Sequence, residues 1–211
     1  MIPAGEASKA DDALRLVVQG TVSETGVEFF RALVKNLATA MNTAGAWITE
    51  YLPERKRLRA YAFWLNGAYV EHFEYDIAGT ACAPVVESKR LVHIPDRLIE
   101  LYPGDPDLVP VNAVSYLGVP LLDVQGDVMG HLSVLDTKPL PAEPRLISLF
   151  EIFAARAAAE SRRLRTEQQV RAREEQLSAL LDGDGRHRGA RRRGRDSPGE
   201  PGRRTAFWLH E

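Results

Sequence analysis

Cysteine and histidine, the residues that most often ligate zinc and iron, are few in this chain. The sequence contains one cysteine, Cys82, and five histidines, of which His72, His93 and His131 fall in predicted strands. Imidazole nitrogens together with a thiolate are ligands that zinc and iron prefer. Because their spacing matches no metal motif, we expect no metal site here. We interpret His131 instead as a polar anchor in an organic-ligand pocket.

Cys82 is open to two interpretations. It lies at the expected start of a short helix, where a cysteine can have a lowered pKa and serve as a sensor thiol or a ligand. Free cysteine is also among the most buried residue types, and we favour this packing role. A single thiol cannot form an internal disulfide, and it fits a reducing compartment such as the cytoplasm.

The sequence contains no common catalytic signature. It has no Gly-x-Ser-x-Gly elbow, no phosphate-binding Gly-Lys-Ser/Thr loop and no His-Glu-x-x-His pair. The formal net charge of -2 gives no general attraction to nucleic acid or anionic lipid. No apolar run approaches the ~20 residues that a membrane span requires. We therefore expect a cytoplasmic binding module, not an enzyme, without direct nucleic-acid or membrane contact.

The N-terminal half of the chain predicts one helix followed by a strand meander. Apolar side chains recur at helical spacing over residues 26–41, and Thr25 and Glu28 have the spacing of a capping box. Stretches rich in aromatic and β-branched residues, separated by turn residues, then predict antiparallel strands. These expected strands are residues 44–52, 57–65 and 68–77.

The next segments are expected to differ in regularity. Residues 79–88 read as a turn that opens a short helix, and residues 91–94 as a strand. The Pro-rich stretch 97–113 predicts a long loop with short helical turns, and long loops in compact domains are usually functional or mobile.

A β-hairpin follows this loop. Residues 116–122 and 130–135 are its expected strands, and Gly126 supplies the positive φ of the turn. Because Pro120 has no N–H to donate, it should lie at a bulge or an unpaired position.

Aromatic side chains are frequent in the predicted sheet. Strict alternation along its strands places Tyr61 and Phe63 on one face and Trp64 on the other. Most of these rings should be core, and some could line a cavity, because ligand pockets are mostly apolar with a few polar groups. The candidate ligand-binding residues are Tyr61, Phe63, Phe73, Cys82, Val85, His93, Tyr116 and His131.

The C-terminal part of the chain predicts a long helix and a tail of different composition. Nothing stops a helix from residue 145 to about 181, and at ~1.5 Å per residue it outruns a domain of this size. We expect residues 166–181 to be a coiled-coil-like connector that pairs with a second copy. Residues 182–211, rich in Arg and Gly, predict a disordered tail. Such a tail can contact nucleic acid, but a frameshifted or truncated gene gives the same composition, so we assign it no function.

Several separate stretches of the sequence occur in the same order as in the GAF domain, a small-molecule sensor module, and resemble it. The resemblance covers about residues 14–165, after an N-terminal extension of residues 1–13. It implies an α+β fold in which a PAS-like antiparallel sheet of about six strands is flanked by N- and C-terminal helices. The stretches are Ala78-Gly79-Thr80-Ala81-Cys82, Ser115-Tyr116-Leu117-Gly118-Val119-Pro120-Leu121 and Gly130-His131-Leu132-Ser133-Val134-Leu135-Asp136.

More narrowly, the chain resembles the N-terminal sensory GAF domains of bacterial GAF/PAS histidine kinases of two-component systems and of sigma-54-type transcriptional activators. This resemblance implies a homodimer through the terminal helices and a PAS, kinase or activator domain in a longer parent. It also implies an unidentified small molecule, bound between the sheet and residues 79–88 and 97–113.

Other members of the family provide alternatives. Bilin-binding relatives typically attach the chromophore at a Cys followed by His, whereas Ala83 follows Cys82 here. A nitric-oxide-sensing relative holds iron with carboxylates and a cysteine, for which Asp76, Asp96 and Cys82 are the candidates. A redox- or metal-sensing domain that uses Cys82, and a dimerisation scaffold with a filled pocket, therefore stay open as alternatives.

Overall fold

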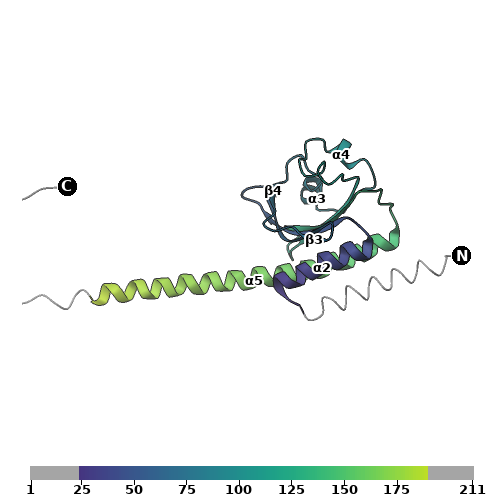
Figure 1. Ribbon diagram of the computed structural model, residues 1–211. Coiled ribbons are helices and arrows are strands. Elements are labelled where there is room, and N and C mark those ends of the chain that lie inside the picture. Colours follow the sequence, from purple (N-terminus) through teal and green to yellow (C-terminus); the bar gives the residue numbers. More distant parts are fainter. Residues whose placement is uncertain (1–23, 190–211) are drawn as a thin grey trace, which may run out of the picture. The chain divides into compact units, whose positions relative to one another are not determined.

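A seven-stranded antiparallel sheet is the central layer of the structure (Figure 1). The computed structural model describes residues 24–189, in two units that divide after Thr166. The strand order is β3-β2-β1-β7-β6-β5, and β4 also pairs with β2. The strands are β1 Gly45–Leu52, β2 Arg57–Leu65, β3 Ala68–Tyr69, β4 Glu74–Asp76, β5 Val92–Ile94, β6 Ser115–Leu122 and β7 Val128–Asp136.

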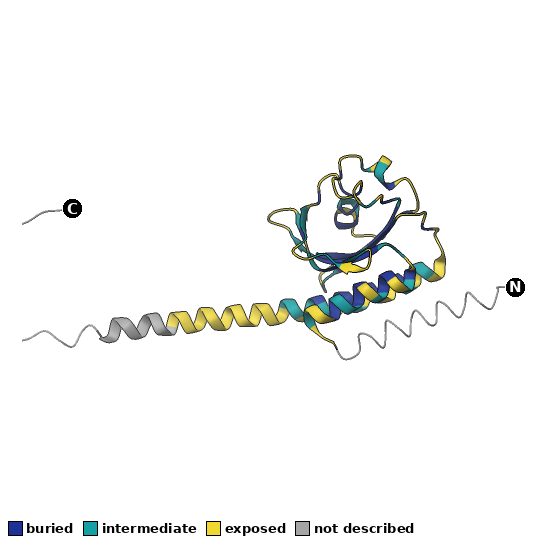
Figure 2. Ribbon diagram, viewed as in Figure 1, coloured by how far each residue is buried: buried dark blue, intermediate teal, exposed yellow. Residues whose placement is uncertain are grey.

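Each face of the sheet is covered by a different layer. Helices α2 (Gly26–Met41) and the first part of α5 (Pro144–Gly189) cover one face, where Phe30, Ile48 and Phe150 are fully buried. Helices α3 (Ala83–Ser88) and α4 (Leu98–Leu101) cover the other face together with the long loops. Figure 2 shows the buried residues gathered on the inner sides of both layers. The predicted α+β fold with flanking helices is thus confirmed.

The free backbone N–H groups at the start of α2 are not capped in the way that the sequence predicts. The expected capping box is wrong, because Thr25 makes no side-chain capping hydrogen bond. Instead, the Gly26 N–H donates to Glu160 Oε1 on α5 at 2.5 Å. A carboxylate from the neighbouring helix therefore takes the place of the local cap, and it joins the two helices.

The expected strand 68–77 is interrupted. It forms the short strands β3 and β4, and His72 between them has a φ of 56°. A left-handed residue cannot continue the ladder, so His72 lies in an exposed connection and its placement in a strand was wrong.

A β-bulge in β2 overturns the predicted orientation of Tyr61. Ile48 pairs with Ala62 and Thr49 with Ala60, which leaves Tyr61 without a partner on β1. The extra residue reverses the alternation, so the Tyr61 ring stacks on Phe30 of α2 with ring centres 4.9 Å apart. Tyr61 and Phe63 thus lie on opposite faces of the sheet.

The β6–β7 hairpin agrees with its prediction. Gly126 has a φ of 84° in the turn. Pro120 pairs only with His131 of β7, beyond the end of β5 and one residue before a shift in register at Leu121. At Pro120, β6 therefore has no neighbouring strand on its β5 side, and the missing N–H leaves no acceptor there without a donor.

The terminal helix is longer than expected, since it ends at Gly189 and not near Leu181. Its residues from Thr166 to Leu180 are exposed, including the apolar Val170 and Leu177. No helix in residues 24–189 combines the length and the apolar character that a membrane span needs. The predicted N-terminal extension and residues 190–211 of the predicted tail lie outside the described residues.

Strands β1 and β7 approach each other so closely at Gly130 that no side chain fits there. A Cβ at this position would lie 1.8 Å from the Thr49 carbonyl oxygen. We expect Gly130→Ala to lower the free energy of unfolding by about 3 kcal/mol or more, because backbone must move to accept it. Urea unfolding followed by circular dichroism measures the change.

Gly104→Ala is the matched control, because a Cβ at Gly104 would meet no atom within 4 Å. It should change stability by less than about 0.5 kcal/mol. Equal stability of the two variants would contradict the close approach of the strands.

Candidate functional site

A cavity of about 200 Å³ lies between the sheet and the loop layer, on the face opposite α2 and α5. Strands β1, β2, β6 and β7 form one side of it, and the turn before α3 and the loop after α4 form the other. This position corresponds to the predicted one. The described residues that line it are Trp47, Phe63, Leu65, Val70, Phe73, Tyr75, Ala81, Cys82, Asp105, Asp107, Leu108, Pro110, Val111, Tyr116 and Leu135.

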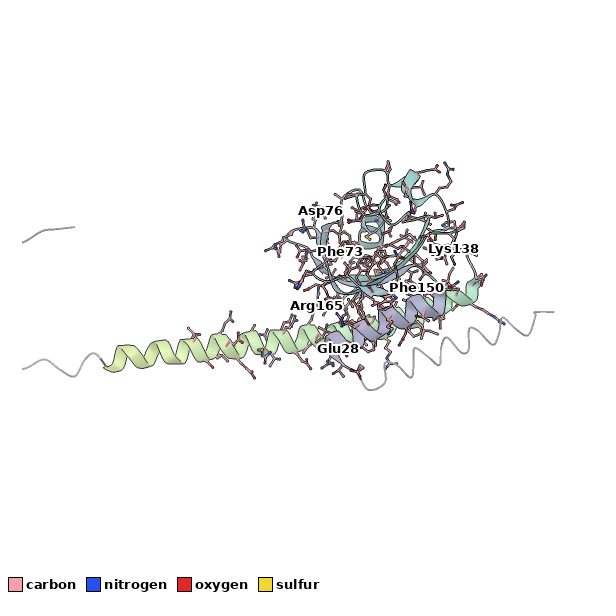
Figure 3. All side chains as sticks on the ribbon, viewed as in Figure 1. Glu28, Phe73, Asp76, Lys138, Phe150 and Arg165 are labelled. Carbon is pink, nitrogen blue, oxygen red and sulfur yellow. The ribbon has the colours of Figure 1, made fainter. Side chains whose placement is uncertain are left out.

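Aromatic rings form a continuous wall of the cavity. The ring centres of Trp47 and Phe63 are 5.4 Å apart, those of Phe63 and Phe73 5.1 Å, and those of Phe73 and Tyr75 4.9 Å. Figure 3 shows Phe73 on the loop side of the sheet, away from Phe150 on the helix side. Such a wall favours a small apolar or planar ligand.

A chain of hydrogen bonds joins the polar atoms at the inner end of the cavity. Trp47 Nε1 donates to the Tyr75 hydroxyl at 3.1 Å, and that hydroxyl lies 3.2 Å from Cys82 Sγ. The Tyr116 hydroxyl donates to Cys82 Sγ at 3.6 Å and lies 2.9 Å from Ser133 Oγ. These donors and acceptors therefore satisfy one another without a ligand.

Gly118 makes room for this arrangement. A Cβ at Gly118 would lie 2.2 Å from the Tyr116 hydroxyl oxygen, which passes over β6 at that point. Any larger residue would move the phenol away from Cys82 and Ser133. The Gly-Val-Pro motif of the sequence thus includes a residue whose lack of a side chain shapes the site.

The environment of Cys82 suppresses its reactivity. Burial raises the pKa of the thiol to about 11, although hydrogen bonds from Tyr75 and Tyr116 act in the opposite direction. Burial also raises the pKa of both phenols well above the ordinary value. All three groups are therefore neutral near pH 7, which agrees with the packing role that we favoured for Cys82.

Two carboxylates lie at the loop side of the cavity. Asp105 is 8% exposed, and its Oδ1 accepts the Asp107 N–H at 3.0 Å. Burial raises the pKa of Asp105, and the charge of Asp107 acts in the same direction. Asp107 itself is exposed.

Four of the eight predicted site residues line the cavity, namely Phe63, Phe73, Cys82 and Tyr116. The other four do not. Tyr61 faces the helix layer, and Val85 is buried in the core around α3. His93 Nε2 lies 2.8 Å from the Leu140 carbonyl oxygen. His131 is held by Thr49, whose Oγ1 lies 2.6 Å from His131 Nδ1.

His131 is fully buried behind Trp47, with ring centres 6.0 Å apart. Its Nε2 has no hydrogen-bond partner, and burial lowers the pKa of the imidazole to about 3. The expected polar anchor is thus a neutral group next to the cavity wall and not part of the lining.

The sequence interpretation missed Trp47, Tyr75 and Asp105 as site residues. The two aromatic residues stood in strands that were already identified, but the choice of face required the tertiary structure. For Asp105 the available signal was the Pro-rich loop 97–113, whose length indicated a functional segment.

The candidate iron ligands of the alternative reading do not come together. Asp76 and Asp96 are exposed, and Cys82 is buried. Within residues 24–189 no group of three or more His, Cys, Asp or Glu side chains could hold a metal ion. The iron-site hypothesis for these residues was therefore wrong.

Comparisons with known proteins agree with this architecture. The chain matches the family model described as "GAF domain" over residues 26–160. No curated protein matches the chain significantly by sequence.

Solved GAF domains with low sequence identity share the fold. One from an Acinetobacter phosphoenolpyruvate-protein phosphotransferase has a TM-score of 0.61 at 19% identity, covering 76% of this chain and 97% of its own. One from the corresponding Coxiella burnetii protein has 0.63 at 16% identity, covering 77% and 98%. The A. aeolicus nlh2 GAF domain in an inactive state has 0.57 at 13% identity, covering 75% and 98%.

The raised pKa of Cys82 predicts that its thiol is alkylated slowly in the folded protein. Relative to an ordinary value of 9.0, a pKa of about 11 lowers the thiolate fraction near neutral pH roughly a hundredfold. Alkylation by iodoacetamide at pH 7.5 should therefore be at least about a hundredfold slower in the native protein than in urea. Mass spectrometry follows the reaction at this single cysteine.

A matched control moves the thiol to the surface. Ser88 is exposed at the end of α3, so Ser88→Cys combined with Cys82→Ser should react at nearly the unfolded rate. Equal native rates for this variant and the wild type would show that burial does not protect Cys82.

The lowered pKa of His131 predicts a loss of stability in acid. The unfolded chain takes up a proton near pH 6.5 that the folded chain accepts only near pH 3. The contribution to stability is therefore complete above pH 6.5 and falls, by several kcal/mol in the limit, as the pH is lowered toward about 3. Urea unfolding from pH 7.5 to pH 4 measures this slope.

His131→Gln should flatten the slope, because Gln does not titrate. His72→Gln, in the exposed connection, should keep the wild-type slope. If both variants show the wild-type pH dependence, burial of His131 is not its cause.

Proposed function

The chain belongs to the GAF domain family, and we propose that it is a small-molecule sensor of a bacterial signal-transduction or transcription-regulatory protein. We propose a regulatory role for it in the cytoplasm, and no catalytic one. The observation that carries the proposal is the aromatic cavity between the sheet and the loop layer. Its volume of about 200 Å³ is below the ~300–1,000 Å³ of drug-sized sites, so the ligand is small.

The sheet supports a route from the ligand to the helices. Adjacent residues of a strand point to opposite faces, so Trp47 lines the cavity whereas Ile48 is buried against the layer of α2 and α5. A ligand that repositions Trp47 moves the strand that also carries Ile48. The ligand shifts the output only to the extent that it binds two arrangements with different affinity.

Two arginines of α5 attach the terminal helix to the ends of the strands. Arg162 donates to the Leu122 carbonyl oxygen at 2.9 Å, and Arg165 to that of Met129 at 3.0 Å. Arg165, labelled in Figure 3, lies near the end of the first unit. Movement of the β6–β7 hairpin is therefore transmitted to α5 through charge-assisted hydrogen bonds.

We propose that α5 pairs with α5 of a second copy and leads to a PAS, kinase or activator domain of a longer parent. Val170 and Leu177 are one heptad apart and exposed, and Leu180 follows at the next heptad contact position. Exposed apolar residues at this spacing fit a helical partner. Arg173 occupies the contact position between Val170 and Leu177, where an apolar residue would stabilise the pair. The expected pairing is therefore weak enough to rearrange.

The alternative with a reactive Cys82 receives less support. The thiol is buried among two phenols, and its raised pKa opposes both oxidation and metal ligation. A scaffold with a filled pocket is also less favoured, because the cavity is not filled by side chains.

Native mass spectrometry of the purified protein, compared with its denatured mass, tests the sensor proposal. We expect a noncovalent small molecule in the native spectrum, and a dimer as the main species. Val111→Trp should abolish the bound mass, because Val111 lines the cavity and an indole would fill it. Val109→Trp is the matched control, since Val109 is 59% exposed on the same loop, outside the cavity.

Loss of the bound molecule in both variants, or in neither, would contradict binding in the cavity. A protein without bound mass that no metabolite stabilises would contradict the sensor proposal itself. A monomer would contradict the role proposed for α5.

A further inference from the structure

The charged side chains of the cavity are all of one sign. Among the described residues that line it, Asp105 and Asp107 are acidic, and none is Lys, Arg or His. An anionic ligand would thus meet carboxylates without a compensating cation. The lining favours a neutral or positively charged ligand.

Of these two carboxylates, Asp105 is buried and Asp107 is exposed. Asp105 is more than nine-tenths buried, and its carboxylate accepts one hydrogen bond from the Asp107 N–H. No basic side chain of the described residues pairs with it. It lies close enough to Cys82 for its charge to raise the pKa of that thiol. A buried carboxylate without a cation is unfavourable, and a cationic ligand would offset this cost.

The remaining lining offers ring faces and few free hydrogen-bond donors. The Trp47 N–H is used by Tyr75, and the Tyr116 hydroxyl is used by Cys82 and Ser133. The rings of Phe63 and Phe73 remain as apolar surfaces with negative faces. Aromatic faces attract ammonium groups, most strongly where water is excluded.

We propose that the ligand of this cavity is a small organic cation of the ammonium class, held by the aromatic wall and paired with Asp105. The inference rests on the proposed sensor function and specifies its ligand. The apolar part of the ligand contacts Phe63 and Phe73, and its charge lies on the side of Asp105. The buried carboxylate selects the cation over neutral and anionic molecules of the same shape.

Three probes of nearly identical shape test the inference. They are choline, the neutral 3,3-dimethylbutanol and the anionic 3,3-dimethylbutyrate, titrated into the full chain by calorimetry. We expect choline to bind at least about tenfold more tightly than the neutral probe, and the anion not to bind. Asp105→Asn should remove the preference for choline and leave the affinity for the neutral probe unchanged. Asn retains an oxygen that can accept the Asp107 N–H.

Asp76→Asn is the matched control, because Asp76 is exposed on β4 and does not line the cavity. It should keep the wild-type preference. If Asp105→Asn does not fold, Phe73→Leu provides a second test, since loss of a ring face should weaken choline binding more than binding of the neutral probe.

The outcomes separate this inference from the sensor function. Equal or tighter binding of the neutral or anionic probe overturns the cation inference and leaves the sensor function standing. An unchanged preference in Asp105→Asn overturns the role of Asp105. Absence of binding by all three probes overturns the cation inference. The sensor function is then tested separately, by whether the native mass spectra show a bound small molecule.

Discussion

The pairing of β1 with β7 joins the two halves of the sheet at its centre. It joins segments more than 80 residues apart in the sequence, and it requires Gly130, because the Thr49 carbonyl occupies the space of a side chain there. The pairing sets Trp47 opposite Ser133 in the middle of the sheet. The cavity wall from β1 and the hydrogen-bonded phenol of Tyr116 therefore meet only because these two strands do.

The polar groups of the candidate site are uncharged, apart from two carboxylates at its loop side. Its thiol and phenols are neutral and are hydrogen-bonded to one another. Among the described residues, no basic side chain pairs with the buried Asp105 carboxylate. Burial thus acts in two ways. It keeps the Cys82 thiol protonated, and it strengthens the attraction between the Asp105 carboxylate and any opposite charge in the cavity.

One sheet serves both the cavity and the helices. The loop layer and the helix layer bury opposite faces of the same strands, so neither face can change without affecting the packing of the other. The bulge at Tyr61 strengthens this connection, because it turns one more ring of β2 onto α2. The contacts of Glu160 and Arg165 then attach α5 to α2 and to the strand ends.

The position of the cavity between sheet and loops was predicted from the resemblance to GAF domains. The residues alone predicted the order of the elements and the antiparallel sheet with helices at both ends. These features follow from local signals: helical periodicity over residues 26–41, β-rich stretches, the turn at Gly126 and the Pro-rich loop. Such signals depend on neighbouring residues, so a single sequence contains them. Four of the eight candidate residues line the cavity, and these signals placed each of them in or beside its element, although not on a face.

Which side chains reach the cavity depends on contacts between segments that are distant in the sequence. Tyr61 changed faces because one extra residue in β2 reverses the alternation, and no local pattern marks that bulge. The α2 cap came from Glu160, and the support of His131 from Thr49, each more than 80 residues away along the chain. Burial sets the pKa values of Cys82 and His131. Burial is a property of the packed layers and not of the residue or its neighbours in sequence.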